Sequence, residues 1–580
     1  MSEPSRRAFH RAIPALAALH AALGLWALWA WIHGPFLGEG VLDGAEVLAL
    51  ARTGSAGPFE TKSPLYPALL RAAFVLAGDS PWTVGCLGIL LSLSALTGVA
   101  RLCAEIGRPQ AAPWAVGLYA LSGSALAYAV QPLPAMFATA LLTWGAVACS
   151  RARRGNSPSA GLVTGLLLGA CSFTRAPLAL AALLLLAWLG ASRCRRAAMG
   201  AGAAVCLVTL GCFAVFGERA WPSGSMLNLR LGNGAERGGL CDLRPGPAYD
   251  RLRLEAACAD PSTRGEPPAF ERFQRSALWS EVRRDVPGAL RTLVRKAYLT
   301  CFRTETVSAA DFRHGLSRFP LAPLLLASFG LVAPLALASL GLLRSAAVWL
   351  PLLGVLAVNV AWLTCARYRF PGLPFACVAA GVFLAARPSA RLWSLAAVLA
   401  LLLNANLSGR SLVVPGDGLV QEGRLWMERD RLAPRALAAY EDALRAGSRD
   451  PRARYELALA LEARGEIGAA EQRYREAIEL DPLYPEAAEN LVALLLRAGR
   501  TADAISEAEA LAQSSPYAGG VWLNLASARR ALDPEADLSD TEAQGFLRLS
   551  LRALAQGDLQ TALRWASAAR ARGLADSRLP

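Results

Sequence analysis

Hydrophobic side chains form long unbroken runs over residues 1–410 and recur at helical spacing after them. The run Ile13–Ile32 has His20 as its only potentially charged side chain. Roughly 20 such residues are enough to cross the roughly 30 Å hydrocarbon layer of a bilayer. We therefore predict about eleven transmembrane helices, the later ones over 82–100, 112–130, 133–149, 159–173, 177–191, 198–216, 320–342, 346–363, 371–386 and 393–407.

Arginines flank these runs and indicate an orientation. Arg6, Arg7 and Arg11 precede the first run, and cationic segments stay in the cytoplasm. The same three residues fit a cleaved signal peptide, but the run is long and lacks a clear small-x-small cleavage site. With a cytoplasmic N-terminus and eleven crossings, the outer segments are 34–80, 217–318 and the residues after Ser408.

A second pattern begins after residue 410, where small and apolar residues recur every 34 positions. The recurring residues are Leu457, Leu491 and Leu525; Gly465 and Gly499; Ala470 and Ala504; and Pro482 and Pro516. The segment Ala453–Pro482 resembles the tetratricopeptide repeat, whose two helices meet at small residues and turn at glycine. We therefore predict an all-α chain with a transmembrane bundle over 1–410 and a repeat solenoid over 411–580. Such a solenoid binds a protein partner or acceptor, or packs on its own membrane domain.

The composition agrees with a chain held partly in a bilayer. Of 580 residues, 54% are hydrophobic and 18% charged, with a mean hydropathy of +0.34. The formal net charge of +14 does not indicate nucleic-acid binding, because most arginines flank apolar runs and form no single basic face. The 12 cysteines show no metal-like spacing, although Cys241 and Cys258 lie in the outer segment, where they could form a disulfide.

An acidic pair lies just after the first run. Asp43 and Glu46 are three positions apart, so on a helix both carboxylates point the same way. A carboxylate held where water is scarce can act as a general base on a sugar hydroxyl. The alternative is that Asp43 caps the helix that follows it, since aspartate is favoured at that position.

A late motif places two arginines on the predicted outer side. Arg367 and Arg369 oppose the usual preference for cations inside, and an anionic ligand would explain the exception. Arginine binds phosphate oxygens in a two-point fashion and stabilises charge on a departing group. The alternative is simple anchoring at the interface by the two arginines and Tyr368.

The first outer segment resembles that of the polyprenyl-phosphate-dependent glycosyltransferases of the GT-C superfamily. The resemblance rests on an acid soon after the first run, a helix, and then the motif SPLYPALL at Ser63–Leu70. This superfamily includes protein O-mannosyltransferases and the transferase that adds aminoarabinose to lipid A. The resemblance implies that Asp43 is catalytic, and we expect Lys62 and Tyr66 to bind the donor with Arg367, Tyr368 and Arg369.

Later stretches extend the resemblance, with one departure. Members often carry an acid where the fourth run opens, whereas this chain has Gln131. The stretches that match are Ser172–Leu180, with Ala176 inserted in a threonine-arginine-proline turn; Ser223–Gly239, with Asn228 and Asn233; Val286–Glu305, with Arg295 and Lys296; and Ala366–Phe375.

The implied reaction moves a sugar from a polyprenyl-phosphate donor to a protein, lipid or glycan acceptor, with inversion. Asp43 deprotonates the acceptor while Arg367 and Arg369 steady the phosphate. Glu46 orients the acceptor or, with Asp43, holds a divalent metal ion, since some members use a metal and others do not. The resemblance also implies a bacterial inner-membrane location with the repeats outside. The alternatives are a non-catalytic repeat scaffold anchored in the membrane and, ranked last, a transporter.

Overall fold

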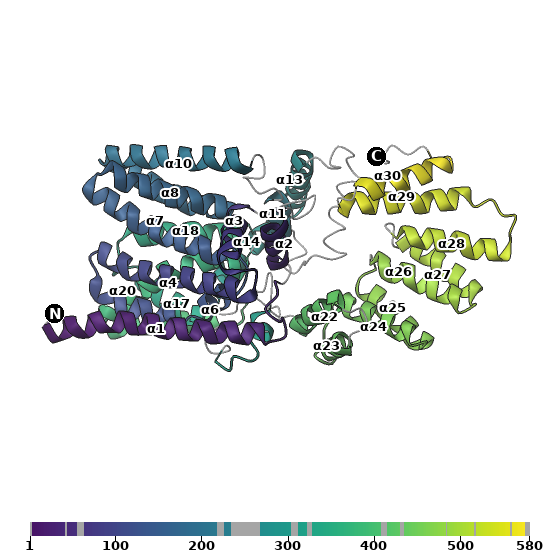
Figure 1. The fold of residues 1–580 in the computed structure, drawn as a ribbon, viewed down its shortest axis with the longest axis horizontal. Coiled ribbons are helices and arrows are strands. Elements are labelled where there is room, and N and C mark those ends of the chain that lie inside the picture. Colours follow the sequence, from purple (N-terminus) through teal and green to yellow (C-terminus); the bar gives the residue numbers. More distant parts are fainter. Residues whose placement is uncertain are drawn as a thin grey trace. The chain divides into compact units, whose positions relative to one another are not determined.

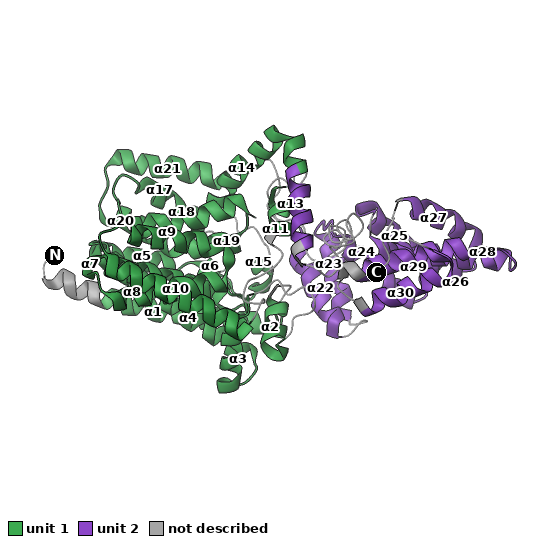
Figure 2. Ribbon diagram, turned by 90° about the horizontal axis from the view of Figure 1, so that it is seen from above, with its two compact units in different colours: residues 1–241, 280–412 green, residues 242–279, 413–580 purple. Residues whose placement is uncertain are grey.

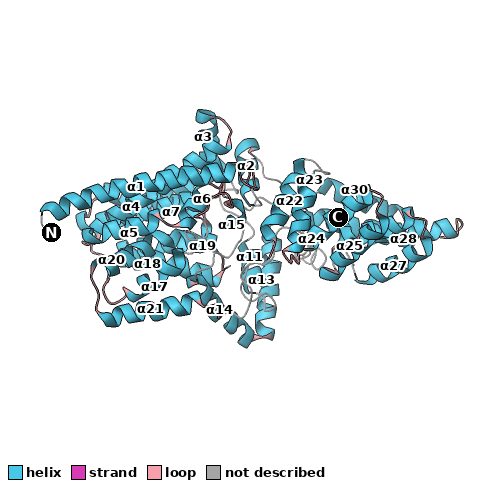
Figure 3. Cartoon of the chain, turned by 90° about the horizontal axis from the view of Figure 1, so that it is seen from below, coloured by secondary structure: helices cyan, strands magenta, loops and turns pink. Residues whose placement is uncertain are grey.

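The computed structural model in Figure 1 describes residues 3–40, 43–54, 63–216, 225–233, 267–302, 311–321, 328–362, 364–407, 415–429, 434–482, 484–514, 518–556 and 559–574. The chain divides into two compact units, coloured separately in Figure 2. Unit 1 comprises residues 1–241 and 280–412, and unit 2 comprises residues 242–279 and 413–580. Among the described residues the regular elements are helices, as Figure 3 shows.

Unit 1 is a bundle whose helices follow the predicted apolar runs. Its helices are α1 (Glu3–Ile32), α2 (Asp43–Thr53), α3 (Leu65–Ala77), α4 (Pro81–Glu105), α5 (Ala112–Ala120), α6 (Gly123–Ala129), α7 (Ala135–Gly155), α8 (Pro158–Thr174), α9 (Ala179–Gly190), α10 (Arg195–Phe216), α11 (Ser225–Asn233), α14 (Val286–Cys301), α15 (Phe312–Gly315), α17 (Ser328–Ala338), α18 (Ala346–Ala361), α19 (Ala366–Arg369), α20 (Leu373–Ala385) and α21 (Ala390–Asn404). Helix α13 (Pro267–Arg284) includes the residues at which unit 2 passes to unit 1.

Several of these helices are apolar enough for a bilayer. Within the described residues, five have the length and composition to cross a membrane: Arg11–Ile32, Pro81–Glu105, Ala135–Gly155, Arg195–Phe216 and Ala366–Ala385. Shorter apolar helices occupy 158–174, 176–190, 329–338, 346–361 and 390–404, so the count of eleven crossings stays a prediction. The predicted run 112–130 is divided at Leu121–Ser122 into α5 and α6. Ser122, Gly123 and Ser124 are poor helix formers. An average hydropathy over the whole run barely changes at these residues, so it does not predict the break.

Small residues bring α8 and α10 into close contact, and α7 lies beside α8 (Figure 1). Gly161 and Gly165 lie one helical turn apart on α8. A Cβ on Gly161 would overlap the carbonyl of Ala197, and one on Gly165 would overlap that of Ala201. Small residues at this spacing let helix backbones approach closely where no hydrophobic effect drives association. The N-terminal half of α8 is therefore held against α10 by backbone contact.

Unit 2 is a helical repeat. Its helices are α22 (Asp417–Arg429), α23 (Pro434–Arg445), α24 (Pro451–Ala463), α25 (Ile467–Leu480), α26 (Pro485–Arg497), α27 (Thr501–Ser514), α28 (Gly519–Leu532), α29 (Ser539–Gln556) and α30 (Leu559–Ala571). Helices α22, α24, α26 and α28 begin 34 residues apart. Gly465 and Gly499 turn the chain between paired helices at φ +78° and +74°, a left-handed conformation that favours glycine. The repeat period predicted from sequence is thus present in the helices.

Candidate functional site

The SPLYPALL motif lies against the end of α8. The Ser63 hydroxyl donates a hydrogen bond to the carbonyl of Phe173. Tyr66 is 2% exposed and packs with Val47 of α2 and Leu70 of α3 in one apolar cluster. Tyr66 therefore joins α2 to α3, and its expected role in donor binding stays a prediction. The motif places this helix pair beside the threonine-arginine turn that follows Phe173.

The acidic pair lies on α2. This helix begins at Asp43, whose side chain lies outside the described residues, as does all of Lys62. Glu46 lies on the exposed face of the same helix. The roles expected for Asp43, Glu46 and Lys62 therefore stay predictions. The structure does show where helix α2, which carries both acids, lies in the bundle.

The first turn of α2 packs on Gln131–Pro132, the stretch where an acid was expected from the resemblance. A Cβ on Gly44 would lie 3.1 Å from Cγ of Pro132. The neighbouring Gln131 is 4% exposed, and its amide nitrogen has no hydrogen-bond partner among the described residues. A buried amide donor is thus held beside the start of the helix that carries Asp43.

The turn at Thr174–Arg175 contacts the turn at Arg367–Arg369. Arg175 ends α8 in an extended conformation, is 8% exposed, and donates from Nη1 to the carbonyl of Arg367 at 2.7 Å. Its guanidinium lies 4.7 Å from the ring centre of Tyr368, and that of Arg367 lies 5.7 Å from the same centre. Residues 192 positions apart in sequence therefore place two cations around one aromatic ring.

Arg369 has a different environment from Arg367. It is 2% exposed, and its Nη1 donates to the carbonyls of Phe302 at 2.5 Å and Thr300 at 3.3 Å. Its guanidinium also lies 4.2 Å from the ring centre of Phe329. These carbonyls belong to the C-terminal end of α14, where the helix dipole is negative. Arg369 therefore ties the turn to α14, whereas Arg367 is half-buried.

The loop residues Asn233 and Lys296 come together at the end of α18. Lys296 is fully buried, and its Nζ donates to Oδ1 of Asn233 and to the carbonyl of Trp362, both at 3.0 Å. Asn233 in turn donates from Nδ2 to the carbonyl of Ala361 at 2.9 Å. Burial lowers the pKa of Lys296 to about 7. The pair satisfies carbonyls that α18 leaves open at its C-terminus.

Sequence reasoning missed Asn359, which links these parts. It is fully buried on α18, donates to the Thr300 hydroxyl at 3.1 Å, and accepts from the backbone nitrogen of Cys365 at 3.1 Å. It therefore joins α14 to the residue that precedes the Arg367 turn. A lone asparagine in an otherwise apolar run was the available signal, because a buried amide in a membrane helix needs partners.

Other predicted residues contribute less to this picture. Arg295 is half-buried, and no contact of its side chain is described. The side chain of Asn228, together with Cys241 and Cys258, lies outside the described residues, so their roles stay predictions. Within the described part of the chain, no group of three or more histidine, cysteine or acidic residues could hold a metal ion.

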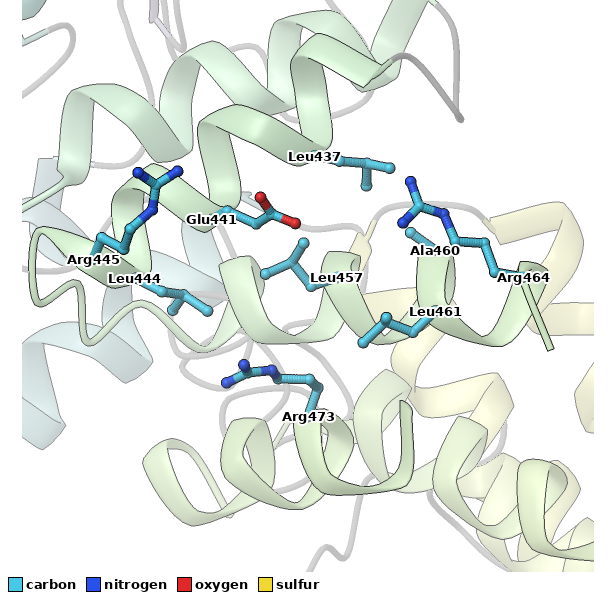
Figure 4. A pocket seen from close by; sticks show the side chains of 9 residues that line it. All are labelled: Leu437, Glu441, Leu444, Arg445, Leu457, Ala460, Leu461, Arg464 and Arg473. Carbon is cyan, nitrogen blue, oxygen red and sulfur yellow. The ribbon is translucent and has the colours of Figure 1, made fainter. Parts of the chain in front are cut away.

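A separate pocket lies in unit 2, between α23, α24 and α25. Its volume is about 320 Å³. Figure 4 shows Leu457 and Leu461 of α24 between arginines of the rim. Arg464 has no ion-pair partner among the described residues. The lining residues are Leu437, Glu441, Leu444, Arg445, Leu457, Ala460, Leu461, Arg464 and Arg473. The pocket thus has an apolar floor and a mainly cationic rim.

No protein-family profile and no curated protein matches this sequence. Among solved structures, ArnT from Cupriavidus metallidurans bound to undecaprenyl phosphate is 14% identical, over 95% of this chain and 79% of that chain, with a TM-score of 0.40. PilF of Pseudomonas aeruginosa is 19% identical, over 32% of this chain and 85% of that chain, at 0.20. The Cut9–Hcn1 hetero-tetramer is 14% identical, over 88% and 91%, also at 0.20. Scores this low place the chain in no family, and the site is interpreted from its own residues.

Proposed function

We propose that this chain is a membrane glycosyltransferase that moves a sugar from a polyprenyl-phosphate donor to an acceptor on the outer face of a bacterial inner membrane. The observation that carries the proposal is the convergence of three separate sequence motifs. The Ser63 hydroxyl contacts the Phe173 carbonyl, and Arg175, two residues further on, contacts the Arg367 carbonyl. Motifs chosen for their resemblance to one enzyme superfamily thus share one end of the bundle.

The proposed step is a single displacement. Asp43 takes the proton of the acceptor hydroxyl, the hydroxyl oxygen bonds to the anomeric carbon, and the bond from that carbon to the phosphate oxygen breaks. The anomeric centre inverts, and the phosphate keeps the bonding electrons. Because the phosphate leaves as an anion, arginine can stabilise it and no strong general acid is needed.

Other expected roles follow from position in this scheme. Arg367 would hold the leaving phosphate, and Glu46 would orient the acceptor or share a divalent ion with Asp43. Asn233 and Lys296 would act indirectly, through the carbonyls that end α18. The outer-face location of all these residues rests on the predicted orientation of the bundle.

The test is transfer of radiolabelled sugar from polyprenyl-phosphate donors in membranes that contain either the wild-type chain or Asp43→Asn. Losing a general base is expected to lower the rate about 10²- to 10⁴-fold. Asp79→Asn is the matched control, because Asp79 is an exposed acid that pairs with Arg52. Equal labelling by wild type and Asp43→Asn at matched expression would exclude Asp43 as the base. No transfer from any donor would favour the scaffold alternative.

For the repeat unit, we propose that the pocket binds a protein segment with an apolar side chain next to carboxylates. The apolar floor and the arginine rim support this partner chemistry. Arg464→Glu is expected to weaken capture of an acidic, leucine-containing peptide about tenfold, measured by fluorescence anisotropy. Arg449→Glu serves as a control, since Arg449 does not line the pocket. Equal affinity of both variants for the peptide would contradict the assignment.

A further inference from the structure

Arg175 is a buried cation without an acidic partner in the described structure. Its side chain makes one hydrogen bond, to the Arg367 carbonyl, and one ring contact, with Tyr368. Within the described residues, no carboxylate forms an ion pair with it. Removing a guanidinium from water is costly unless a counter-charge and further hydrogen bonds compensate. None of the remaining side-chain nitrogens of Arg175 is both buried and unbonded, so these N–H groups are open to a ligand, and an anion that reached them would supply the missing counter-charge.

The two guanidiniums around Tyr368 strengthen this requirement. Both lie within reach of one ring, at 4.7 and 5.7 Å from its centre. Like charges that contact the same ring repel each other, and burial of Arg175 weakens the screening of this repulsion by water. An anion contacted by both would offset the repulsion, and a phosphate offers several oxygens to two planar forks at once.

Arg369 is less suited to the same ligand. Its Nη1 is directed at the carbonyls that end α14, and its guanidinium lies over Phe329. Turning it toward a ligand would leave those carbonyls without their donor, at a cost typical of buried unsatisfied groups. Arg369 instead fixes the backbone of the turn that presents Arg367.

We propose that Arg175 and Arg367 together bind the phosphate of the lipid carrier, and that Arg369 is a positioning residue for that site. The inference rests on the proposed function for the identity of the lipid, while the need for an anion follows from the arginines themselves. It adds Arg175 to the donor site and gives Arg369 a role different from that of Arg367.

The test measures binding by the full chain in nanodiscs, using undecaprenyl phosphate, undecaprenol and inorganic phosphate as separate probes. Arg175→Gln is expected to weaken undecaprenyl phosphate binding about tenfold or more and to leave the weaker binding of undecaprenol unchanged. Arg369→Lys is expected to lower the Tm of the unliganded protein, while the folded fraction keeps its affinity within about twofold.

Two further variants keep the result interpretable. Arg153→Gln removes an arginine that lies 4.1 Å from the ring of Trp188, near the opposite end of the α7–α8 hairpin, and should bind all three probes like wild type. Arg175→Lys keeps the charge but loses the planar fork, and it replaces Arg175→Gln if that variant does not fold. An intermediate affinity for undecaprenyl phosphate in Arg175→Lys supports two-point binding.

The outcomes separate this inference from the proposed function. Wild-type affinity of folded Arg175→Gln for undecaprenyl phosphate would overturn the assignment of Arg175 to the phosphate site. Loss of binding in folded Arg369→Lys would overturn the positioning role of Arg369. Equal affinity of the wild type for inorganic phosphate and the lipid would overturn the carrier as ligand. Failure of the wild type to bind undecaprenyl phosphate at all would instead contradict the proposed function.

Discussion

Buried or partly buried arginines near the repeat core and at the motif end of the bundle have different partners. In the repeats they pair with glutamates: Glu471 with Arg475 and Arg500, and Glu489 with Arg552 at 2.9 Å. In the bundle, Arg175 and Arg369 donate instead to backbone carbonyls and lie against aromatic rings. These repeat arginines have acidic partners within their own unit, whereas Arg175 and Arg369 have backbone oxygens as partners.

This difference indicates different roles for the arginines of the two units. The arginines that pair with Glu471 are 43% and 44% exposed, so water screens these pairs, and the repeats should depend mainly on their apolar core. Buried cations that donate to carbonyls and lie against rings are costly to desolvate and can be stabilised further by an anionic ligand. The net charge of +14 therefore combines two kinds of arginine that composition alone cannot separate.

The largest expected effect concerns the core of the repeats. Leu491 is fully buried in the main apolar cluster of unit 2. Leu491→Ala should lower the free energy of unfolding of that unit by about 2–5 kcal/mol, because it leaves a cavity. Thermal unfolding followed by circular dichroism measures the loss, with the exposed Leu532→Ala as control. Equal loss in both variants would contradict a core-dominated repeat.

A smaller effect should appear in the bundle as a dependence on pH. Burial lowers the pKa of Lys296 to about 7 in the folded chain, against roughly 10.4 when unfolded. Between these values the unfolded state binds more protons, so the folded state gains stability as pH rises, by at most about 1.4 kcal/mol per pH unit. Below about pH 7 the lysine is charged in both states and this gain is lost.

Lys296→Met should therefore flatten the rise in Tm between about pH 7 and pH 9. Scanning fluorimetry of the wild type, Lys296→Met and the exposed Arg291→Met measures the difference. An unchanged slope in Lys296→Met would mean that Lys296 titrates at its ordinary pKa. Burial would then perturb the charge of Lys296 no more than water-screened surroundings perturb the ion pairs of the repeats.

The smallest effect should come from removing an acid that pairs two arginines. Glu471 is itself 10% exposed and lies between Arg475 and Arg500, whose side chains are 43% and 44% exposed, so water screens both pairs from the arginine side. Glu471→Gln should lower stability by no more than about 1 kcal/mol, and high salt should abolish the difference. Chemical unfolding at two salt concentrations tests this. A larger, salt-independent loss would show that charge pairing contributes as much as the core.

Much of the fold was predictable because its signals are local. Apolar runs and the 34-residue spacing of Leu457, Leu491 and Leu525 depend on nearby residues, and the helices follow both. The break at Ser122 was not predicted, because two polar residues barely change the average hydropathy of a long run. The positions of the helices were thus predicted better than the breaks within them.

The candidate site was predicted less completely. Arg367 and Arg369 lie in one short motif and look equivalent in sequence, yet their environments differ because a turn sends neighbouring side chains to different elements. Arg175 was noticed as part of a motif but not as a ligand-binding residue, since its contact with Arg367 spans 192 positions. Likewise, the pairing of Asn233 with Lys296 depends on where α18 ends.

The close contact of α8 with α10 has an evolutionary consequence. At Gly161 and Gly165 even one added methyl group would overlap the backbone of α10, so neither position can change alone while the helices keep their spacing. Any lineage that replaces one of these glycines must also move α8 and α10 apart, and a rigid shift of α8 would carry Arg175 with it. We therefore expect these glycines to vary less among relatives than the apolar residues around them, and to change only together with their neighbours on α10.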